Sequence, residues 1–191
     1  MKIIGLCGKA GSGKDTVADY LVSEHDYTKL SFAGPLKAGV CAMFGWSPEQ
    51  LNDRVWKETA LPVIGKSPRE IMQTLGTEWG RKCVRNDLWL LLMLAAIEKE
   101  IEYTAHLNTQ TFSANTFETR IVISDVRFEN EAELIRAKGG TIYHIMRDVG
   151  SVAAHESEAG LSWHWSDYCV ANKASKAELF QNVEDMICSR H

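Results

Sequence analysis

A glycine-rich loop, set between a short apolar run and a helical segment, constrains this chain more than any other feature. Residues 2–7 have the apolar character of a strand buried in a parallel sheet, and apolar residues at helical spacing begin near Lys14. Between them, residues 8–16 carry a glycine, four residues, a second glycine and a lysine, which is the Walker A spacing. Glycines let the backbone curl so that successive N–H groups face one anion at the start of a helix. The loop therefore predicts a binding site for a phosphate chain.

The residues of this loop predict how ATP is held. Lys14 can reach the β- and γ-phosphates. The loop differs from the usual pattern at Asp15, which stands where a Ser or Thr normally binds Mg²⁺ through its hydroxyl. Asp15 could hold Mg²⁺ directly or through water, and Thr16 could contact the α-phosphate; this departure disfavours a GTPase or a motor protein. The predicted ATP-binding residues are Gly11, Ser12, Gly13, Lys14, Asp15 and Thr16.

Apolar strands alternate with helical segments along the chain, which predicts a parallel sheet covered by helices on both faces. The fold class is therefore α/β, a P-loop NTPase-type parallel sheet flanked by helices, with a helical acceptor-binding region and a mobile lid. Two Ser-Pro pairs, at Ser47 and Ser67, begin predicted helices with capping boxes. The predicted elements are strands at 2–7, 27–32, 120–125, 141–146 and 167–171, and helices near 14–23, 33–44, 48–54, 68–83, 87–103 and 129–138, with a C-terminal helix capped by Ser175.

We expect one P-loop kinase domain over residues 1–191. Its core comprises about 1–32 and 120–191, its acceptor-binding region about 33–103 and its lid about 147–166. Residues 104–119 are rich in Thr and Asn without apolar periodicity, and predict a surface loop or hairpin of no assigned role.

Composition narrows the class of protein further. The formal net charge of −4 over 191 residues argues against bulk nucleic-acid binding, which needs a basic face. The longest apolar run, residues 88–97, is about half the ~20 residues needed to cross a bilayer. The five cysteines form no CxxC pair, so we expect free thiols in a reducing compartment. These features predict a cytoplasmic protein without nucleic-acid or membrane partners.

A carboxylate and a guanidinium follow the strand predicted at residues 120–125. Asp125 can orient Mg²⁺ or accept the proton of the acceptor, and Arg127 can clamp the phosphate in transfer. Alternatively, Asp125 caps the helix that begins at Glu129. Arg147 begins an irregular stretch that is either a lid or an ordinary surface loop. With Lys14, these three residues are the predicted catalytic set, and Asp15 and Asp125 are the predicted Mg²⁺ ligands.

Two further segments predict the acceptor pocket. Lys37 lies at a strand-to-helix turn after Phe32, and Arg69 and Gln73 lie four residues apart on one helix. Arg can hold a monophosphate in a bidentate manner, Gln can read a base edge, and Phe32 or Trp79 could stack on a base. Each residue alone could equally be a solvated charge or a core aromatic. The acceptor set predicted from these residues is Lys9, Phe32, Lys37, Arg69, Gln73, Trp79, Arg127 and Asn130.

The chain resembles the bacteriophage deoxynucleoside monophosphate kinase family, a branch of the P-loop nucleoside monophosphate kinases. The resemblance rests on GLCGKAGSGKDT, LSFAGPLK, RxxxQxLGTEWGR, VISDVRFENEA, HESEAGL and DYCVANKASKAEL, which together span nearly the full length. It implies Mg²⁺-dependent transfer from ATP to dNMPs, in many members by a homodimer. It also implies that Lys37, Arg69, Gln73, Arg127 and Glu158 lie near the acceptor and that His155 and Glu158 begin the lid, although residues 147–166 contain only one arginine.

Two other functions fit the same loop. One is a related small-molecule kinase that acts on dephospho-coenzyme A or phosphomevalonate, against which Phe32, Gln73 and Trp79 favour a nucleotide. The other is a nucleotide-binding protein without catalysis. Acceptor-dependent formation of ADP would separate a kinase from a binding module.

Overall fold

The computed structural model describes residues 1–110, 116–147 and 161–188. These residues form two compact units, which we call the sheet unit (Met1–Ser31 and Ala95–His191) and the helical unit (Phe32–Leu94). The predicted division by role into core, acceptor region and lid stays a prediction. The elements, in chain order, are β1 (Lys2–Cys7), α1 (Lys14–His25), β2 (Thr28–Leu30), α2 (Gly34–Phe44), α3 (Pro48–Asn52), α4 (Arg54–Glu58), α5 (Pro68–Gln73), the π-helix η1 (Thr74–Val84), α6 (Leu88–Gln110), β3 (Arg120–Ile123), α7 (Glu129–Ala137), β4 (Thr141–Met146), β5 (Tyr168–Ala171) and α8 (Lys176–Cys188).

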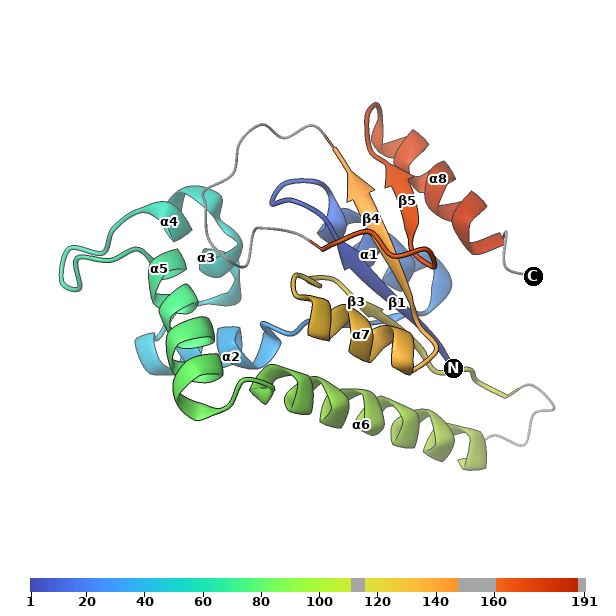
Figure 1. Ribbon diagram of the computed structural model, residues 1–191, viewed down its shortest axis with the longest axis horizontal. Helices are drawn as coiled ribbons and strands as arrows, with labels where there is room; N and C mark the ends of the chain where they lie inside the picture. Colours follow the sequence, from blue (N-terminus) through green and yellow to red (C-terminus); the bar gives the residue numbers. More distant parts are fainter. Residues whose placement is uncertain (111–115, 148–160, 189–191) are drawn as a thin grey trace. The chain divides into compact units, whose positions relative to one another are not determined.

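The sheet unit is built on a parallel sheet with the strand order β2-β3-β1-β4-β5. Figure 1 labels four of these strands, β3, β1, β4 and β5. Every pairing between the described strands is parallel, with Gly5 opposite both Ile123 of β3 and Ile142 of β4. From the central strand β1 the chain moves to one side for β2 and β3, and then to the other for β4 and β5. Ligands of such sheets bind at the carboxyl ends of the strands near this reversal, so the loop after β1 lies at the preferred position.

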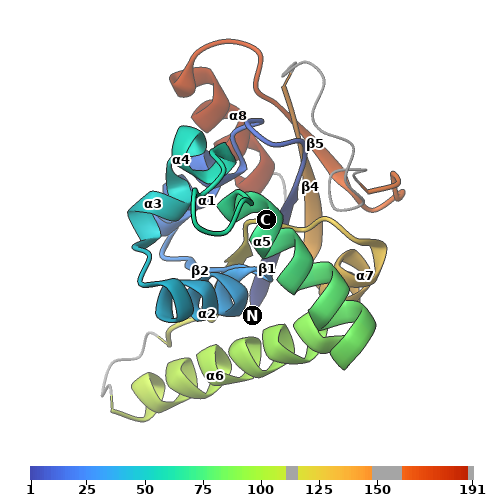
Figure 2. The same ribbon diagram turned by 90° about the vertical axis from the view of Figure 1, so that its left-hand side faces the viewer.

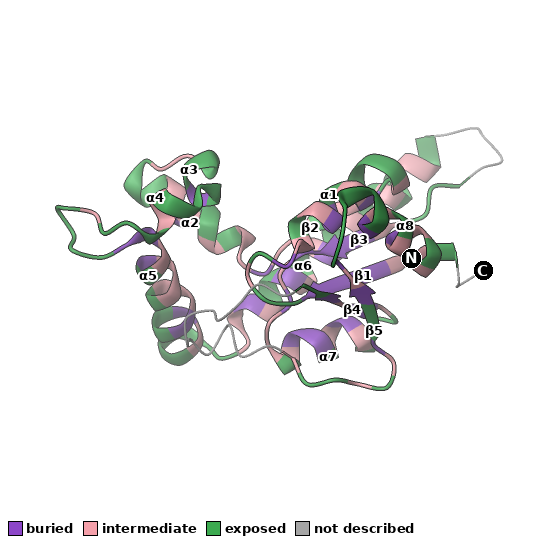
Figure 3. Cartoon of the chain, turned by 90° about the horizontal axis from the view of Figure 1, so that it is seen from above, coloured by how far each residue is buried: buried purple, intermediate pink, exposed green. Residues whose placement is uncertain are grey.

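Helices cover both faces of this sheet, which confirms the predicted fold class. Figure 3 shows α1 and α8 on one side of the strands and α7 on the other. Alternate residues of β1 lie on the two faces of the sheet, because successive side chains of a strand point in opposite directions. Ile4 and Leu6 join the cluster with α1 and α8, whereas a Cβ at Gly5 would lie 2.8 Å from Cδ1 of Ile135 in α7.

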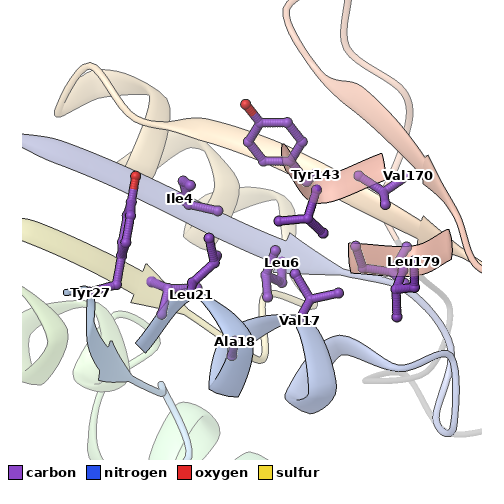
Figure 4. Packing of buried hydrophobic residues seen from close by; sticks show 12 residues of the cluster. Ile4, Leu6, Val17, Ala18, Leu21, Tyr27, Tyr143, Val170 and Leu179 are labelled. Atoms are coloured by element: carbon purple, nitrogen blue, oxygen red, sulfur yellow. The ribbon is translucent and has the colours of Figure 1, made fainter. Parts of the chain in front are cut away.

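The core between the sheet, α1 and α8 contains a cluster of buried hydrophobic side chains (Figure 4). Leu6 and Leu21 are fully buried in it, and Tyr143 of β4 is 1% exposed. Burial of a Leu or Ile side chain stabilises the folded chain by about 1.5–3 kcal/mol. This core therefore fixes the start of α1 against the end of β1, which are the two ends of the glycine loop.

The helical unit confirms both predicted capping boxes. The Ser47 hydroxyl accepts from the N–H of Gln50, the Gln50 side chain accepts from the N–H of Ser47, and Ser67 and Glu70 repeat the arrangement. The helix predicted at 48–54 is instead two short helices, since Asp53 has an extended backbone and caps α4 by accepting from the N–H of Trp56 at 2.8 Å.

The single helix predicted at 68–83 is wrong in its second part, which is a π-helix that continues from α5 (Figure 2). Close packing on glycines accompanies the wider helix. A Cβ at Gly80 would lie 2.7 Å from the Trp89 ring, and one at Gly76 would lie 3.1 Å from Leu36. The indole N–H of Trp89 donates to the Gly76 carbonyl at 2.8 Å. Extended π-helices are rare and often lie at functional sites.

The loop or hairpin predicted at 104–119 is wrong for residues 104–110, which extend α6. The polar side chains there bond to the helix itself. The Thr104 hydroxyl donates to the Glu100 carbonyl at 2.9 Å and the Thr109 hydroxyl to the His106 carbonyl at 2.7 Å, so they do not require a turn. Residues 111–115 lie outside the described residues.

Candidate active site

The glycine loop, residues 8–16, curls between the end of β1 and the start of α1. Gly8, Gly11 and Gly13 all have positive φ, of 141°, 79° and 102°. Only glycine reaches such angles without a steric cost, because any other residue places a Cβ against its own backbone. The glycines of the motif are therefore required by the backbone path of the loop.

Lys14 lies across the mouth of this loop. Its amine donates to the carbonyls of Gly8 at 2.6 Å and Lys9 at 2.9 Å, so a cation stands where the loop begins. The N-cap of α1 is Gly13, which has no side chain to bond the first N–H groups of the helix. Such N–H groups and the positive end of the helix dipole suit an anion. The arrangement can hold a phosphate chain between backbone amides and one ammonium group.

The turn after β3 lies beside the start of the glycine loop. The N–H of Val126 donates to the Leu6 carbonyl at 3.1 Å, which places the turn carrying Asp125 and Arg127 next to the end of β1. Both side chains are half-buried. The structure thus brings Lys14, Asp125 and Arg127 onto the same edge of the sheet.

A buried carboxylate shapes this turn. Glu131 of α7 is 2% exposed, and its Oε2 accepts from the N–H groups of Arg127 at 2.8 Å and Phe128 at 3.2 Å. A charged acceptor that bonds two backbone N–H groups fixes the backbone strongly. Glu131 therefore holds the peptide groups from which the Arg127 side chain projects.

Two buried polar atoms are left without a hydrogen-bond partner among the described residues, the Ser12 hydroxyl and Oδ1 of Asn130. Both residues belong to the sets predicted to bind ATP or the acceptor. Buried polar atoms are usually hydrogen-bonded, and an exception calls for an explanation such as a missing ligand or water. These two atoms fit a site that is completed by a polar ligand.

Asp15, the predicted Mg²⁺ ligand, forms an ion pair with Lys29 of β2. The Lys29 amine lies 2.9 Å from Oδ1 of both Asp15 and Asp19. Burial alone would lower the pKa of Lys29, but the hydrogen bonds to Asp19 and Asp15 outweigh it and raise the pKa above its ordinary value. The Asp15 side chain is 79% exposed, so solvent still reaches it.

The helical unit carries most of the predicted acceptor residues. Arg69 and Gln73 lie one turn apart in α5, and Nε of Arg69 donates to Glu58 of α4 at 2.5 Å. The Trp79 side chain in η1 is 51% exposed, whereas Phe32 is 5% exposed. Of the two predicted stacking residues, Trp79 therefore has the accessible ring. Lys37 lies exposed in α2.

Three more predicted residues, Arg147, His155 and Glu158, follow β4 in the sequence. Arg147 is exposed directly after β4, and the predicted lid residues His155 and Glu158 lie outside the described residues. Directly before β5, Asp167 accepts three hydrogen bonds from the Arg136 guanidinium and lies 2.9 Å from Nε2 of His144. Burial alone would raise the pKa of Asp167, but these partners outweigh it and lower the pKa.

Sequence reasoning missed four residues that support the site: Lys29, Glu58, Glu131 and Asn172. Glu131 stands at the third position of α7, where an acidic residue often bonds back to the start of the helix, so a local signal existed. The partners of the other three lie far along the chain or in a neighbouring helix, and no local pattern indicates them.

Comparison with known proteins decides the family. The family model described as deoxynucleotide monophosphate kinase matches residues 50–183 of the chain. A putative deoxynucleotide monophosphate kinase of Acanthamoeba polyphaga mimivirus is 33% identical, over 96% of this chain and 94% of the relative. The chain belongs to the deoxynucleotide monophosphate kinase family. This kinase is also 27% identical to the deoxynucleoside-5'-monophosphate kinase of Escherichia phage T5, over 70% of this chain and 71% of the relative.

Membership makes the chain a nucleoside monophosphate kinase, a phosphotransferase whose family implies the use of ATP. It decides against the acceptors of the related small-molecule kinases and against a binding protein without catalysis. The fold of the kinase is similar to the crystal structure of TT1252 from Thermus thermophilus, with a TM-score of 0.50, 16% identity, and coverage of 99% of this chain and 97% of that one. Among the described residues, no helix is both long and apolar enough to span a bilayer.

Proposed function

We propose that this kinase transfers the γ-phosphoryl group of ATP to a deoxynucleoside monophosphate, giving a deoxynucleoside diphosphate and ADP. The observation that carries the proposal is the glycine loop, curled by three left-handed glycines at the carboxyl end of the central strand, with the Lys14 amine across its mouth. Phosphoryl transfer needs little covalent chemistry from a protein, and depends on position and positive charge around the transferring group.

In this proposal the backbone of residues 11–16 binds the phosphates of ATP, and Lys14 moves from its own loop carbonyls to the β- and γ-phosphates. Arg127 clamps the transferring group, and Arg147 adds charge from the end of β4. Asp125 accepts the proton of the acceptor or orients Mg²⁺. The position of Asp125 and Arg127 beside the end of β1 supports these roles.

Mg²⁺ fits the donors that this edge of the sheet offers. It is bound by one or two carboxylates together with substrate phosphates and water, and Asp15 and Asp125 supply the carboxylates. No group of three or more His, Cys, Asp or Glu side chains able to hold a metal occurs within the described residues, so a protein-only metal cage is not the basis of the proposal. When bound, Mg²⁺ would neutralise charge on the phosphate oxygens.

On the acceptor side, we assign the monophosphate to Arg69 and Lys37, the base edge to Gln73, and base stacking to the exposed ring of Trp79. The ion pair with Glu58 supports the role of Arg69, because it fixes one edge of the guanidinium. Lys9, Phe32, Asn130 and Glu158 complete the predicted set. The unpartnered Oδ1 of Asn130 favours its inclusion.

A panel of dNMPs and NMPs tests the proposal. Each is incubated with ATP and Mg²⁺, and the diphosphate products are separated by chromatography. We expect ADP to form only when a dNMP acceptor is present, and an enzyme that forms no diphosphate from any dNMP would refute the assignment. The same panel establishes which bases are accepted and whether ribonucleotides are excluded. The homodimer and the cytoplasmic location stay predictions.

The variant Lys14→Ala tests the catalytic role of Lys14 in the same assay. It should abolish transfer, because it removes the cation at the centre of the phosphate site, and should leave the thermal unfolding midpoint close to that of the wild type. A kcat close to the wild-type value would remove Lys14 from the catalytic set.

A further inference from the structure

A side chain that follows the edge strand β5 holds the glycine loop from one side. Asn172 follows β5, and its Nδ2 donates to the carbonyl of Ser12 at 2.8 Å. Its backbone N–H donates to the Met146 carbonyl of β4 at 2.9 Å, so the residue that holds the loop is itself fixed to the sheet. Asn172 is 9% exposed and Ser12 1% exposed, which makes this a buried hydrogen bond.

The geometry of the peptide group gives this bond a consequence for the inner side of the loop. In a trans peptide the C=O of one residue and the N–H of the next point in opposite directions. Since Asn172 draws the Ser12 carbonyl outward, the N–H of Gly13 is turned to the opposite side of the loop. A phosphate chain in the loop would meet this N–H there, next to the first N–H groups of α1.

Gly13 is the residue that allows the contact. Its φ is +102°, and a Cβ on it would lie only 2.5 Å from Nδ2 of Asn172 and 3.8 Å from Cδ2 of Leu179. The amide therefore packs directly against the peptide that it orients. Both the angle and the contact require a glycine at this position of the motif.

We propose that Asn172 is a positioning residue for the phosphate-binding loop. Its side-chain amide fixes the Ser12–Gly13 peptide plane and so aims the Gly13 N–H at the phosphates of the bound nucleotide. This inference rests on the proposed function only in that the loop must bind ATP. It assigns to a residue about 160 positions from the loop a part in binding ATP that does not involve contact with the nucleotide.

The test removes the donor and keeps the shape of the side chain. Asn172→Leu has the same branched outline but cannot donate to the Ser12 carbonyl, and it adds no charge near the phosphates. We expect the Kd for ATP with Mg²⁺, measured by isothermal titration, to rise about tenfold, which corresponds to about 1.4 kcal/mol and to one buried hydrogen bond. The KM for ATP should rise with it, while the KM for the dNMP acceptor should stay within about twofold of the wild-type value.

Asn182→Leu is the matched control. Nδ2 of Asn182 in α8 donates to the Ala171 carbonyl at 3.0 Å, so this variant loses a bond of the same kind to a carbonyl outside the loop. Both variants should lower the thermal unfolding midpoint, but only Asn172→Leu should weaken the binding of ATP. If the two variants lose stability alike and both bind ATP as the wild type does, Asn172 is merely structural and the inference is overturned.

A measurement on the wild-type protein keeps the inference testable if Asn172→Leu does not fold. In ¹⁵N-resolved NMR, addition of ATP with Mg²⁺ should shift the backbone amide signal of Gly13 strongly and the side-chain amide signals of Asn172 much less. A Gly13 signal that does not move would contradict the inference. Failure of the wild type to bind ATP would instead refute the proposed function, so the two failures can be told apart.

Discussion

Gly8→Ala should destabilise the protein more than an alanine at an ordinary glycine position. Gly8 has a φ of +141°, and a Cβ there would lie 2.6 Å from the backbone carbonyl oxygen of Ile145 and 2.8 Å from the Ser12 hydroxyl. The carbonyl cannot move aside, because β4 is paired with β1 up to Cys7 and His144, one residue before the contact. The substitution therefore meets a strained angle and a clash with fixed backbone together.

The two effects can be sized separately. Holding a residue other than glycine in a sparsely populated region of φ and ψ lowers the stability of the folded protein by about 1–3 kcal/mol. Overpacking a close-packed interior lowers it further, by about 1–3 kcal/mol. Their sum, about 2–6 kcal/mol, is a large share of the roughly 5–15 kcal/mol by which native domains are stable. At about 2–4 °C per kcal/mol for a chain of this size, the unfolding midpoint should fall by about 4 °C at least.

Differential scanning calorimetry of Gly8→Ala beside Gly39→Ala measures this effect. Gly39 lies inside α2, with nothing within 4 Å of an added Cβ and no left-handed φ. Alanine there should stabilise the protein by about 0.5–1 kcal/mol, since glycine is a poor helix former. A Gly8→Ala midpoint within about 2 °C of the wild type would show that the angle and the clash do not act as argued.

Two further predictions concern carboxylates of the sheet unit. Glu131→Gln should lower kcat severalfold without changing the Kd for ATP, because the loss of the charged acceptor loosens the turn after β3. The exposed Glu133→Gln is its control, and equal kcat values for both variants would contradict the role. The pKa of Asp167 is lowered below its ordinary value of 3.8, so folding favours the ionised carboxylate. The contribution of Asp167 to stability is therefore present above pH 3.8, and it is lost as the pH falls through the pKa that this group has in the folded protein. Urea denaturation between about pH 5 and pH 2 should therefore show a weaker pH dependence for Asp167→Asn than for the wild type, and parallel curves would refute this.

Local chemistry made parts of this fold predictable from sequence. The glycine loop, the buried strands β1, β3 and β4 and the two capping boxes each depend on residues within a few positions of one another. The turn that carries Asp125 and Arg127 was located correctly because parallel strands place their carboxyl ends on one edge. These are the features for which sequence spacing and spatial distance nearly coincide.

The features that were not predicted depend on partners elsewhere. The π-helix η1 lies where Gly76 and Gly80 allow Leu36 and Trp89 to pack closely, which periodicity alone does not reveal. The sequence predicts a loop at the tail of α6 because Thr and Asn favour turns, but here the Thr hydroxyls donate to carbonyls of the helix itself. Asn172 is one polar residue after a strand, and its role emerges only from the contact with Ser12.

The uneven distribution of the tryptophans, among them the Trp89 that packs against η1, has a spectroscopic consequence. Of the six tryptophans, four lie in the helical unit, at positions 46, 56, 79 and 89, and two lie at 163 and 165. Tryptophan fluorescence, excited at a wavelength that tyrosine does not absorb, therefore reports on the helical unit and on one short segment after β4, because the strands of the sheet contain tyrosine but no tryptophan. Melting curves recorded by fluorescence and by circular dichroism would separate if the two units lose their structure at different temperatures, and no label would have to be added to observe it.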